Sequence, residues 1–165
     1  MSILSDRSII DCIIHKGVYL VNPFNQEQLQ PNSYDCGLAD ELKTIDGTVI
    51  NLSEEDYDLK PNEFILGSTL ETVNIPLNIC GHVDGKSSIG RLGVFVHVSS
   101  GFIDSGFQGN ITLEIYNCSN KNFTLKSGMS ICQLVFETLT SPVIQPYGSR
   151  GNHYQGSKGT VRSYL

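Results

Sequence analysis

The chain has 165 residues, of which 39% are hydrophobic and 17% charged, a composition that fits a globular domain and excludes a disordered chain. The net charge of −6 argues against a nucleic-acid surface, which needs a basic stripe, but a few placed cations can still hold a small anion. No apolar run approaches membrane-spanning length and the first residues do not resemble a signal peptide. Five scattered cysteines indicate reduced thiols, so we expect a cytoplasmic protein with no membrane partner.

A short helix is predicted near the N-terminus, packed against a sheet. Ser5 and Asp6 precede it, and Gly17 is its expected end. Its apolar face is formed by Ile9, Ile10, Ile13 and Ile14. The next segment, Val18–Val21, is predicted to be a short strand.

The rest of the chain consists of short apolar runs separated by Gly, Pro, Asn, Asp and Ser, a pattern typical of a β-sandwich or barrel. The predicted strands include Thr48–Leu52, Glu63–Ser68, Val94–Val98, Ile111–Tyr116, Phe123–Leu125 and Ile131–Phe136. Neither an internal repeat nor a domain boundary is evident. We therefore expect a single, mainly β domain over residues 1–165, with one short N-terminal helix.

The segment Asp84–Arg91 offers hydroxyls, cations and flexible backbone within eight residues. Such a segment can wrap a phosphate with N–H groups, side-chain hydroxyls and a guanidinium. Its spacing is not that of a Walker P-loop. A helix N-terminus with ordinary capping explains part of the same composition, so both interpretations stay open.

Glu114 lies in the middle of a predicted strand. Period-2 alternation places Ile111, Leu113 and Ile115 on one face, and Thr112, Glu114 and Tyr116 on the other. Glu114 then either lies on a solvated sheet face or points into a cleft, where a carboxylate can act as an acid and base. Asp104 lies in a glycine-rich turn, where it either stabilises the turn or binds a sugar hydroxyl or a water.

Several catalytic motifs are missing. The zinc-deaminase and HExxH zinc patterns do not occur, and neither does a GxSxG elbow or a GxGxxG turn. Hydrolytic chemistry in this chain is therefore expected to proceed without protein-bound zinc.

The last segment, residues 145–165, is rich in Gly, Ser, Tyr and basic residues and lacks apolar periodicity. It is either a frayed tail or a flexible arm that closes over a ligand.

Several motifs together resemble the dCTP deaminase branch of the dUTPase-like superfamily, and in particular the bifunctional dCTP deaminase–dUTPases. They are the run GKSSIGRLGVFVHVSSGFID with the following GFQG and ITLEIYN, the segment Gln30–Asp35, the strand entry around Lys126–Leu134, and Pro146-Tyr147-Gly148 with Tyr154-Gln155-Gly156. The resemblance covers nearly the whole chain. It implies a distorted jelly roll assembled as a homotrimer with active sites between subunits, a dCTP or dUTP substrate, and Mg²⁺ held mainly by the triphosphate.

The resemblance also assigns roles to residues. Glu114 is the implied catalytic acid and base, Ser87 and Arg91 orient water and stabilise charge, and Asp104 meets the sugar and the water network. The backbone of Thr112 and Leu113 reads the pyrimidine edge. The remaining implied nucleotide contacts are Lys86, Ser88, Ser100, Gln133, Tyr147, His153 and Lys158.

The implied chemistry agrees with these residues. Deamination needs water to attack C4 of cytosine and a group that moves protons to N3 and to the departing ammonia, which one carboxylate can do. Dual activity requires that dUTP is then cut to dUMP and pyrophosphate.

Three positions differ from the usual family pattern. His153 stands where a Lys is common, Ser157 stands where a Gln is common, and Ser100 stands where an Ala is usual beside the attacked carbon. Two further functions therefore stay open: a dUTP or dCTP pyrophosphatase without deamination, and a non-catalytic nucleotide-binding regulatory protein.

Overall fold

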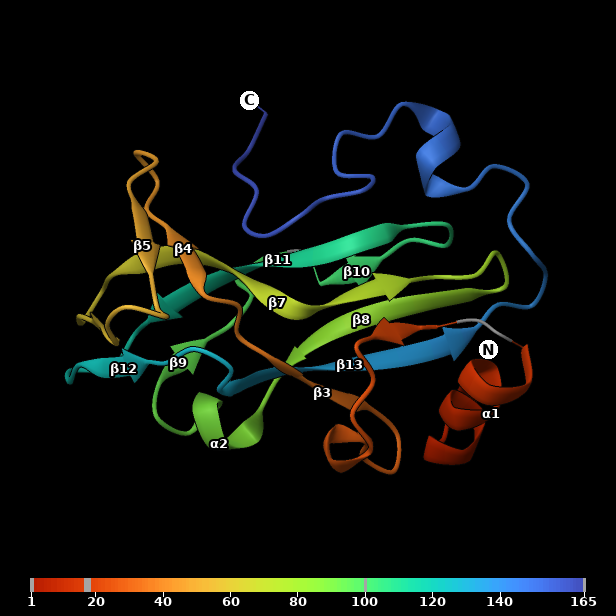
Figure 1. Ribbon diagram of the computed structural model, residues 1–165, viewed down its shortest axis with the longest axis horizontal. Helices are drawn as coiled ribbons and strands as arrows, with labels where there is room; N and C mark the ends of the chain where they lie inside the picture. Colours follow the sequence, from red (N-terminus) through yellow and green to blue (C-terminus); the bar gives the residue numbers. More distant parts are fainter. Residues whose placement is uncertain (1, 17–18, 100, 165) are drawn as a thin grey trace.

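The computed structural model describes residues 2–16, 19–99 and 101–164, which form two main antiparallel sheets (Figure 1). The first sheet has the order β1 (Ser2–Ile3), β13 (Ser130–Thr138), β8 (Ile79–Gly85) and β10 (Phe102–Ile103), and β3 (Tyr34–Gly37) also pairs with β13. The second has the order β5 (Val49–Asn51), β4 (Glu41–Lys43), β7 (Phe64–Asn74), β11 (Gln108–Asn117) and β9 (Val94–Phe95), and β2 (Val21–Asn22) also pairs with β7. A separate ribbon joins β6 (Tyr57–Leu59) to β12 (Phe123–Leu125).

Helices play a small part in the fold. The predicted N-terminal helix is confirmed as α1 (Asp6–Lys16), and Ile9 of its apolar face is fully buried. The expected end at Gly17 and the first residue of the next predicted strand, Val18, lie outside the described residues. The other helices in the described residues are the single turn α2 (Ser87–Gly90) and the 3-10 helices η1 (Gln26–Gln28) and η2 (Tyr147–Arg150). No helix in the described part of the chain is long and apolar enough to cross a bilayer.

The prediction of a mainly β fold is confirmed, and several strand bounds differ from those expected. Phe123–Leu125 is predicted without error, and β11 and β13 are slightly longer than predicted. The prediction for Val94–Val98 is wrong beyond Phe95, because the amides of Val98 and Ser99 turn toward the carboxylate of Glu114. Asp84 and Gly85 belong to β8 and not to a turn, so the polar segment starts only at Lys86.

The long strand β7 contains an irregularity where it pairs with β11. Asn110 lies opposite Thr72 and Thr112 lies opposite Ser68, so Thr69–Glu71 of β7 face the single residue Ile111. The side-chain amide of Asn110 donates to the carbonyls of Thr69 (2.9 Å) and Glu71 (3.0 Å). Asn110 thus satisfies backbone groups that the irregular pairing would leave without partners.

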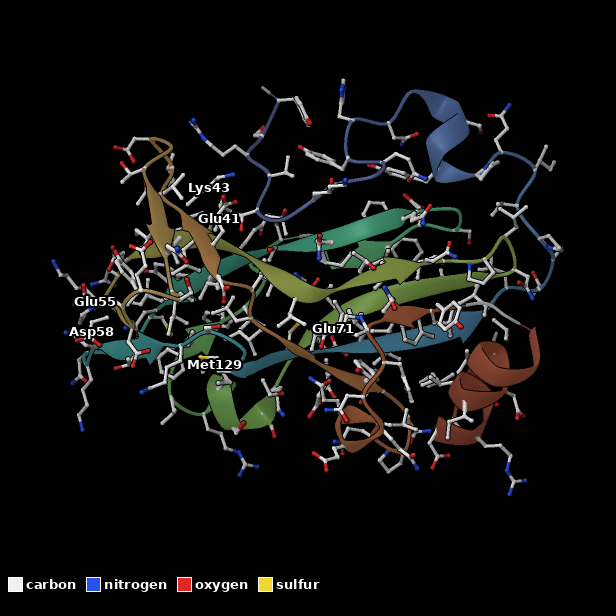
Figure 2. The ribbon with its side chains drawn as sticks, in the orientation of Figure 1. Glu41, Lys43, Glu55, Asp58, Glu71 and Met129 are labelled. Carbon is white, nitrogen blue, oxygen red and sulfur yellow. The ribbon has the colours of Figure 1, made fainter. Side chains whose placement is uncertain are left out.

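Glu71 on this irregular segment is a buried carboxylate, with only 1% of its surface exposed (Figure 2). It accepts hydrogen bonds from the amide of Gly37 (3.0 Å) and from the side chain of Gln28 (3.2 Å). Burial raises the pKa of the Glu71 carboxyl, and the hydrogen bonds that it accepts oppose that shift. Glu71 therefore ties β7 to β3 and η1 through polar bonds inside the protein.

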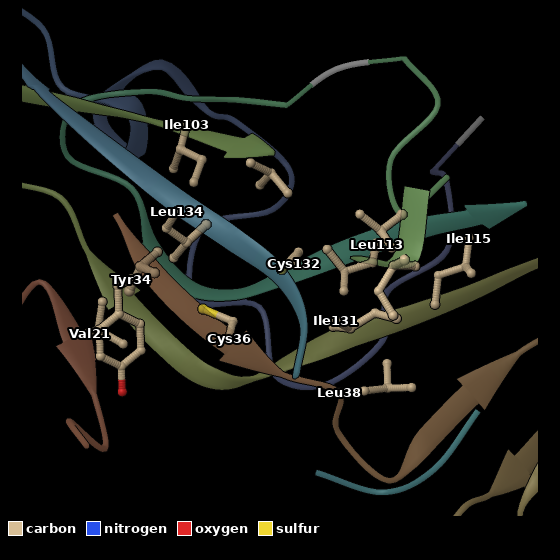
Figure 3. Packing of buried hydrophobic residues seen from close by; sticks show 14 of the residues in the cluster. Val21, Tyr34, Cys36, Leu38, Ile103, Leu113, Ile115, Ile131, Cys132 and Leu134 are labelled. Carbon is tan, nitrogen blue, oxygen red and sulfur yellow. The ribbon is translucent and has the colours of Figure 1, made fainter. Parts of the chain in front are cut away.

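The core lies between the sheets and is lined by alternate residues of the long strands (Figure 3). On β11, Leu113 and Ile115 point into it, and on β13, Leu134 and Phe136 do the same. All four are fully buried, and each such side chain contributes roughly 1.5–3 kcal/mol of burial free energy. This packing fixes the inward face of β11, so Thr112 and Glu114 must project from its other face.

Candidate active site

A pocket of about 760 Å³ opens between β11, β10 with its following turn, and the C-terminal segment. Two carboxylates line it: Glu114 from the middle of β11 and Asp104 from the turn after β10. Two tyrosines of the C-terminal segment, Tyr147 and Tyr154, line it as well. The pocket therefore combines acidic groups with aromatic rings, as a site for a base and a sugar requires.

Glu114 points into this pocket, as the second sequence interpretation predicted. Its Oε2 accepts the amides of Val98 (3.1 Å) and Ser99 (3.0 Å), and its Oε1 lies 3.2 Å from the hydroxyl of Ser99. These three donors fix the carboxylate at one place and orientation. A carboxylate held in this way on a rigid strand is suited to proton transfer at a fixed point.

Asp104 lies at the start of a tight turn, and its carbonyl accepts the amide of Phe107 at 3.1 Å. Gly106 in this turn has a φ of 89°, and a Cβ there would lie 2.5 Å from Cβ of Pro146. Glycine is thus required both by the backbone conformation and by the close approach of the C-terminal segment. The turn places Asp104 at the pocket. The backbone of the same turn holds the C-terminal segment, because the carbonyl of Ser105 accepts the amide of Tyr147.

Thr112 and Leu113 lie where the predicted alternation puts them: Leu113 is fully buried and Thr112 lines the pocket. Ile111 does not follow the prediction. It lines the pocket and is only partly buried, because the irregular pairing with β7 removes it from the regular core face. A β-irregularity beside a pocket often redirects a side chain in this manner.

The C-terminal segment lies over the pocket through both backbone and rings. The amide of Tyr147 donates to the carbonyl of Ser105 (2.9 Å), and its ring packs edge-on against Phe107 with centroids 5.4 Å apart. Burial raises the pKa of the Tyr147 hydroxyl. His153 stacks on Tyr164 (5.3 Å between centroids) and Lys158 is exposed, so neither lines the pocket in this conformation.

Lys86 and Gln133 form a second polar group, away from the pocket. The ammonium of Lys86 lies 2.6 Å from Oδ2 of Asp35 and 2.8 Å from the hydroxyl of Ser130. The side-chain oxygen of Gln133 accepts the hydroxyl of Ser33 at 2.9 Å. These contacts join the ends of β3, β8 and β13 around a charged pair that is largely shielded from solvent.

α2 extends this second group to the surface. Ile89 is buried and holds the helical turn, while Ser87, Ser88 and Arg91 are exposed. Figure 1 shows α2 below the sheets and the C-terminal segment above them, with the body of the sheets between. One chain therefore brings together Asp104, Thr112, Glu114 and Tyr147, and leaves the Lys86–Arg91 segment on another side of the molecule.

Sequence reasoning missed three residues that hold the predicted ones in place: Asp35 for Lys86, Ser99 for Glu114, and Asn110 for the irregular strand. Asp35 falls in the Gln30–Asp35 motif, and this motif could have marked Asp35 as a residue of the site. Nothing in the local pattern marks Ser99 or Asn110, because their contacts come from tertiary structure. The predicted contact Ser100 lies outside the described residues.

The described residues offer no ready-made cage for a metal ion. No group of three or more His, Cys, Asp or Glu side chains among them is placed to hold one. A metal that arrives on a triphosphate needs few protein ligands, since phosphate oxygens supply most of its coordination. The exposed carboxylate of Asp104 is the pocket group best suited to such a metal–nucleotide complex.

Comparison with known proteins gives a consistent result. A family model described as dCTP deaminase-like matches residues 3–139. A protein of Methanosphaera stadtmanae named "dCTP deaminase, dUMP-forming" is 40% identical over 181 residues, covering 96% of this chain and 91% of that protein. A protein of Mycobacterium tuberculosis with the same name is 40% identical over 183 residues, covering 98% of this chain and 96% of that protein.

Solved structures agree on the fold. The 2'-deoxycytidine 5'-triphosphate deaminase of Agrobacterium tumefaciens superposes with a TM-score of 0.71 at 20% identity. The match covers 82% of this chain and 48% of that one, so this chain spans about half of that protein. The dUTPase of EIAV superposes with a TM-score of 0.52 at 22% identity, covering 78% of this chain and 91% of that one.

Proposed function

This chain belongs to the dCTP deaminase-like family, and from that membership we propose that it is an enzyme that converts dCTP to dUMP. The first step is dCTP + H₂O → dUTP + NH₃, and the second is dUTP + H₂O → dUMP + pyrophosphate. The observation that carries the proposal is the carboxylate of Glu114, held by three donors at the wall of a pocket that also contains Asp104.

In the first step, Glu114 takes a proton from the water that attacks C4 of cytosine and passes it to N3. The proton of the hydroxyl group now on C4 then goes to the amino group as the C4–N4 bond breaks, so that ammonia leaves and C4 keeps a carbonyl oxygen. One carboxylate serves both transfers because it returns to its ionised form after the first and can accept a second proton. Protein-bound zinc has no role in this route.

The second step uses the same pocket at the other end of the nucleotide. We assign to Asp104, which lines this pocket, the binding of the sugar and the orientation of the water that attacks the α-phosphate. Mg²⁺ carried by the triphosphate neutralises its charge when bound. Tyr147 and Tyr154 line the pocket on the side of the C-terminal segment, where they would shield the nucleotide from bulk water.

The phosphates need cations, and those predicted from the sequence are not in this pocket. We place Lys86, Ser87, Ser88, Arg91 and Gln133 of a neighbouring subunit against it, in a homotrimer with sites between subunits. Two features support this assembly: the exposed polar side chains of α2, and the exposed apolar side chains near α2 and the pocket, Leu92, Phe95 and Phe102. All five cysteines are reduced, outside any disulfide, which supports a reducing, cytoplasmic setting.

The test is product analysis with dCTP and Mg²⁺. We expect ammonia, dUMP and pyrophosphate in equal amounts, and we expect Glu114→Gln to abolish ammonia release while nucleotide binding survives. Glu27→Gln, an exposed carboxyl of η1, is the matched control and should keep full activity.

Other outcomes identify the alternatives. Formation of dCMP and pyrophosphate without ammonia would identify a pyrophosphatase, which the departure at Ser100 favours, because an added hydroxyl beside the attacked carbon can displace the attacking water. Nucleotide binding without any turnover would identify a regulatory protein. Unchanged turnover in Glu114→Gln would refute the role of Glu114.

A further inference from the structure

We propose that β4 and its hairpin are a docking site that fixes residues 157–162 of the C-terminal segment, with Lys43 and Thr160 as positioning residues. This inference rests on the proposed function, since it concerns how the segment is held over the nucleotide pocket. The segment is then a strap attached near its start, where Tyr147 bonds to Ser105, and near its end, at Thr160. Figure 2 shows Lys43 and Glu41 on β4 close to the last stretch of chain.

Thr160 is buried against β4. It has only 1% of its surface exposed, although threonine is a residue type found mostly at the surface. Its carbonyl accepts the ammonium of Lys43 at 2.7 Å, and its hydroxyl donates to the carbonyl of Glu41 at 2.7 Å. The carbonyl and the hydroxyl of this buried threonine are thus both matched to β4, as a specific docking site requires.

Lys43 is preorganised for this contact. Its ammonium also lies 2.9 Å from Oε1 of Glu41, and only 23% of its side chain is exposed. A cation held by a neighbouring carboxylate loses less freedom when it binds a carbonyl. Further along the hairpin, Arg162 donates to the carbonyl of Ile45 at 2.6 Å.

The other side of the segment is held by β11. The amide of Gly159 donates to Oδ1 of Asn110 (3.1 Å), and the amide of Val161 donates to the hydroxyl of Thr112 (3.1 Å). The backbone amide of Asn110 donates to the carbonyl of Ser157 at 2.9 Å. The segment is therefore bonded to both β4 and β11, and it lies beside Thr112, which lines the pocket.

Close approach to β11 is built into the sequence. Gly109 has a φ of 148°, and a Cβ there would lie 2.8 Å from both the backbone nitrogen and the backbone oxygen of Ser157. Only glycine lets the two backbones meet at this point. Gln155 and Gly156 are also hydrogen-bonded, to Gly106 and Gln108, so the strap closes by movement of residues 148–154, which carry the exposed His153 and Tyr154.

Hydrogen exchange of the amides in residues 157–161, measured without nucleotide, tests the docking site directly. Lys43→Met removes the charged donor and should speed exchange about tenfold, and Thr160→Val should speed it about fivefold. Thr160→Ser keeps the hydroxyl and should restore slow exchange. Lys60→Met, at an exposed lysine after β6, is the matched control and should leave exchange unchanged.

Kinetics separate positioning from simple loss of structure. In Lys43→Met the KM for dCTP should rise about tenfold while kcat stays within about twofold, because the strap closes less often but closes in the same way. Global melting should be unchanged. Exchange or KM equal to the wild-type value in both variants would overturn the proposal.

This design also separates the inference from the proposed function. A wild-type protein that releases no ammonia but shows slow exchange at 157–161, accelerated by Lys43→Met, would refute the deaminase and support the docking site. An active deaminase with fast exchange at these amides in the wild type would overturn the docking site and leave the deaminase in place.

Discussion

The ammonium of Lys86 lies 2.6 Å from Oδ2 of Asp35, so a carboxylate on β3 holds the first cation of the segment that leads into α2. The pair is largely shielded, with 24% of the Lys86 side chain and 12% of the Asp35 side chain exposed. A shielded pair keeps its geometry better than a surface pair, because water competes less for each partner. Lys86 therefore points in a defined direction before any nucleotide binds.

Asp35→Asn is the first prediction. The loss of the charged acceptor frees Lys86, and we expect the KM for dCTP to rise about tenfold, since a hydrogen bond to a charged group contributes roughly 1.5–3 kcal/mol. Steady-state kinetics and nucleotide titration measure the change. Asp58→Asn, at an exposed position on β6, is the control. An unchanged KM would mean that Lys86 does not contact the substrate.

Ser99→Ala is the second prediction. The hydroxyl of Ser99 contacts Glu114, but the two backbone amides remain, so the carboxylate is held less firmly and not released. One neutral hydrogen bond contributes about 0.5–1.5 kcal/mol, and we therefore expect kcat for ammonia release to fall about threefold to tenfold. Nucleotide affinity should not change. Ser53→Ala, in an exposed turn, serves as the control, and a larger effect on binding than on kcat would contradict the argument.

The third prediction concerns Glu71 and pH. Burial raises the pKa of this carboxyl in the folded state, so its favourable contribution to stability is fully present below the ordinary carboxyl pKa and is lost as pH rises through the raised value. Glu71→Gln removes the ionisation. The melting temperature of this variant relative to wild type should therefore increase from pH 4 to pH 8, whereas that of Glu27→Gln should not. An equal difference at both pH values would refute the burial argument.

Gly109→Ala is the fourth prediction. The new Cβ would meet the backbone of Ser157 and would also strain the positive φ, so the C-terminal segment cannot pair with β11. We expect a loss of roughly 1–3 kcal/mol in stability and faster hydrogen exchange at residues 156–161. Gly90→Ala is a suitable control because a Cβ there meets no atom within 4 Å. Wild-type exchange in Gly109→Ala would show that the segment does not depend on this close approach.

The sequence predicted what local patterns determine. Alternation along Thr112–Asn117 gave the inward and outward faces of β11 correctly, and the capping residues located α1. Several strands without an apolar run, such as β3 and β8, were not predicted. The predicted strand ended too early, at Ser68, because the continuation of β7 contains the polar residues Thr69 and Glu71. Both are buried, and they accept hydrogen bonds from the distant backbone amides of Ile111 and Gly37.

The site was predicted in part, for a similar reason. Asp104, Thr112, Glu114 and Tyr147 lie around one pocket, as expected from residues near one another in sequence or matched by motif. The separate position of Lys86–Arg91 depends on the direction in which β8 leaves the sheet, and no local pattern encodes that direction. The structure shows where these residues lie, and the roles of all of them, including Gln133, His153 and Lys158, stay predictions.

The irregular pairing of β7 with β11 has a consequence for which changes of length the chain tolerates. Thr69–Glu71 of β7 face the single residue Ile111 of β11, so β7 has two more residues than β11 over this stretch. Side chains on a strand alternate between its two faces with a period of two residues. Inward and outward positions therefore stay in phase on both sides of Ile111. A deletion of two residues from Thr69–Glu71 should preserve the faces of β7, whereas a deletion of one would turn half of the strand inside out and place Val73 in solvent.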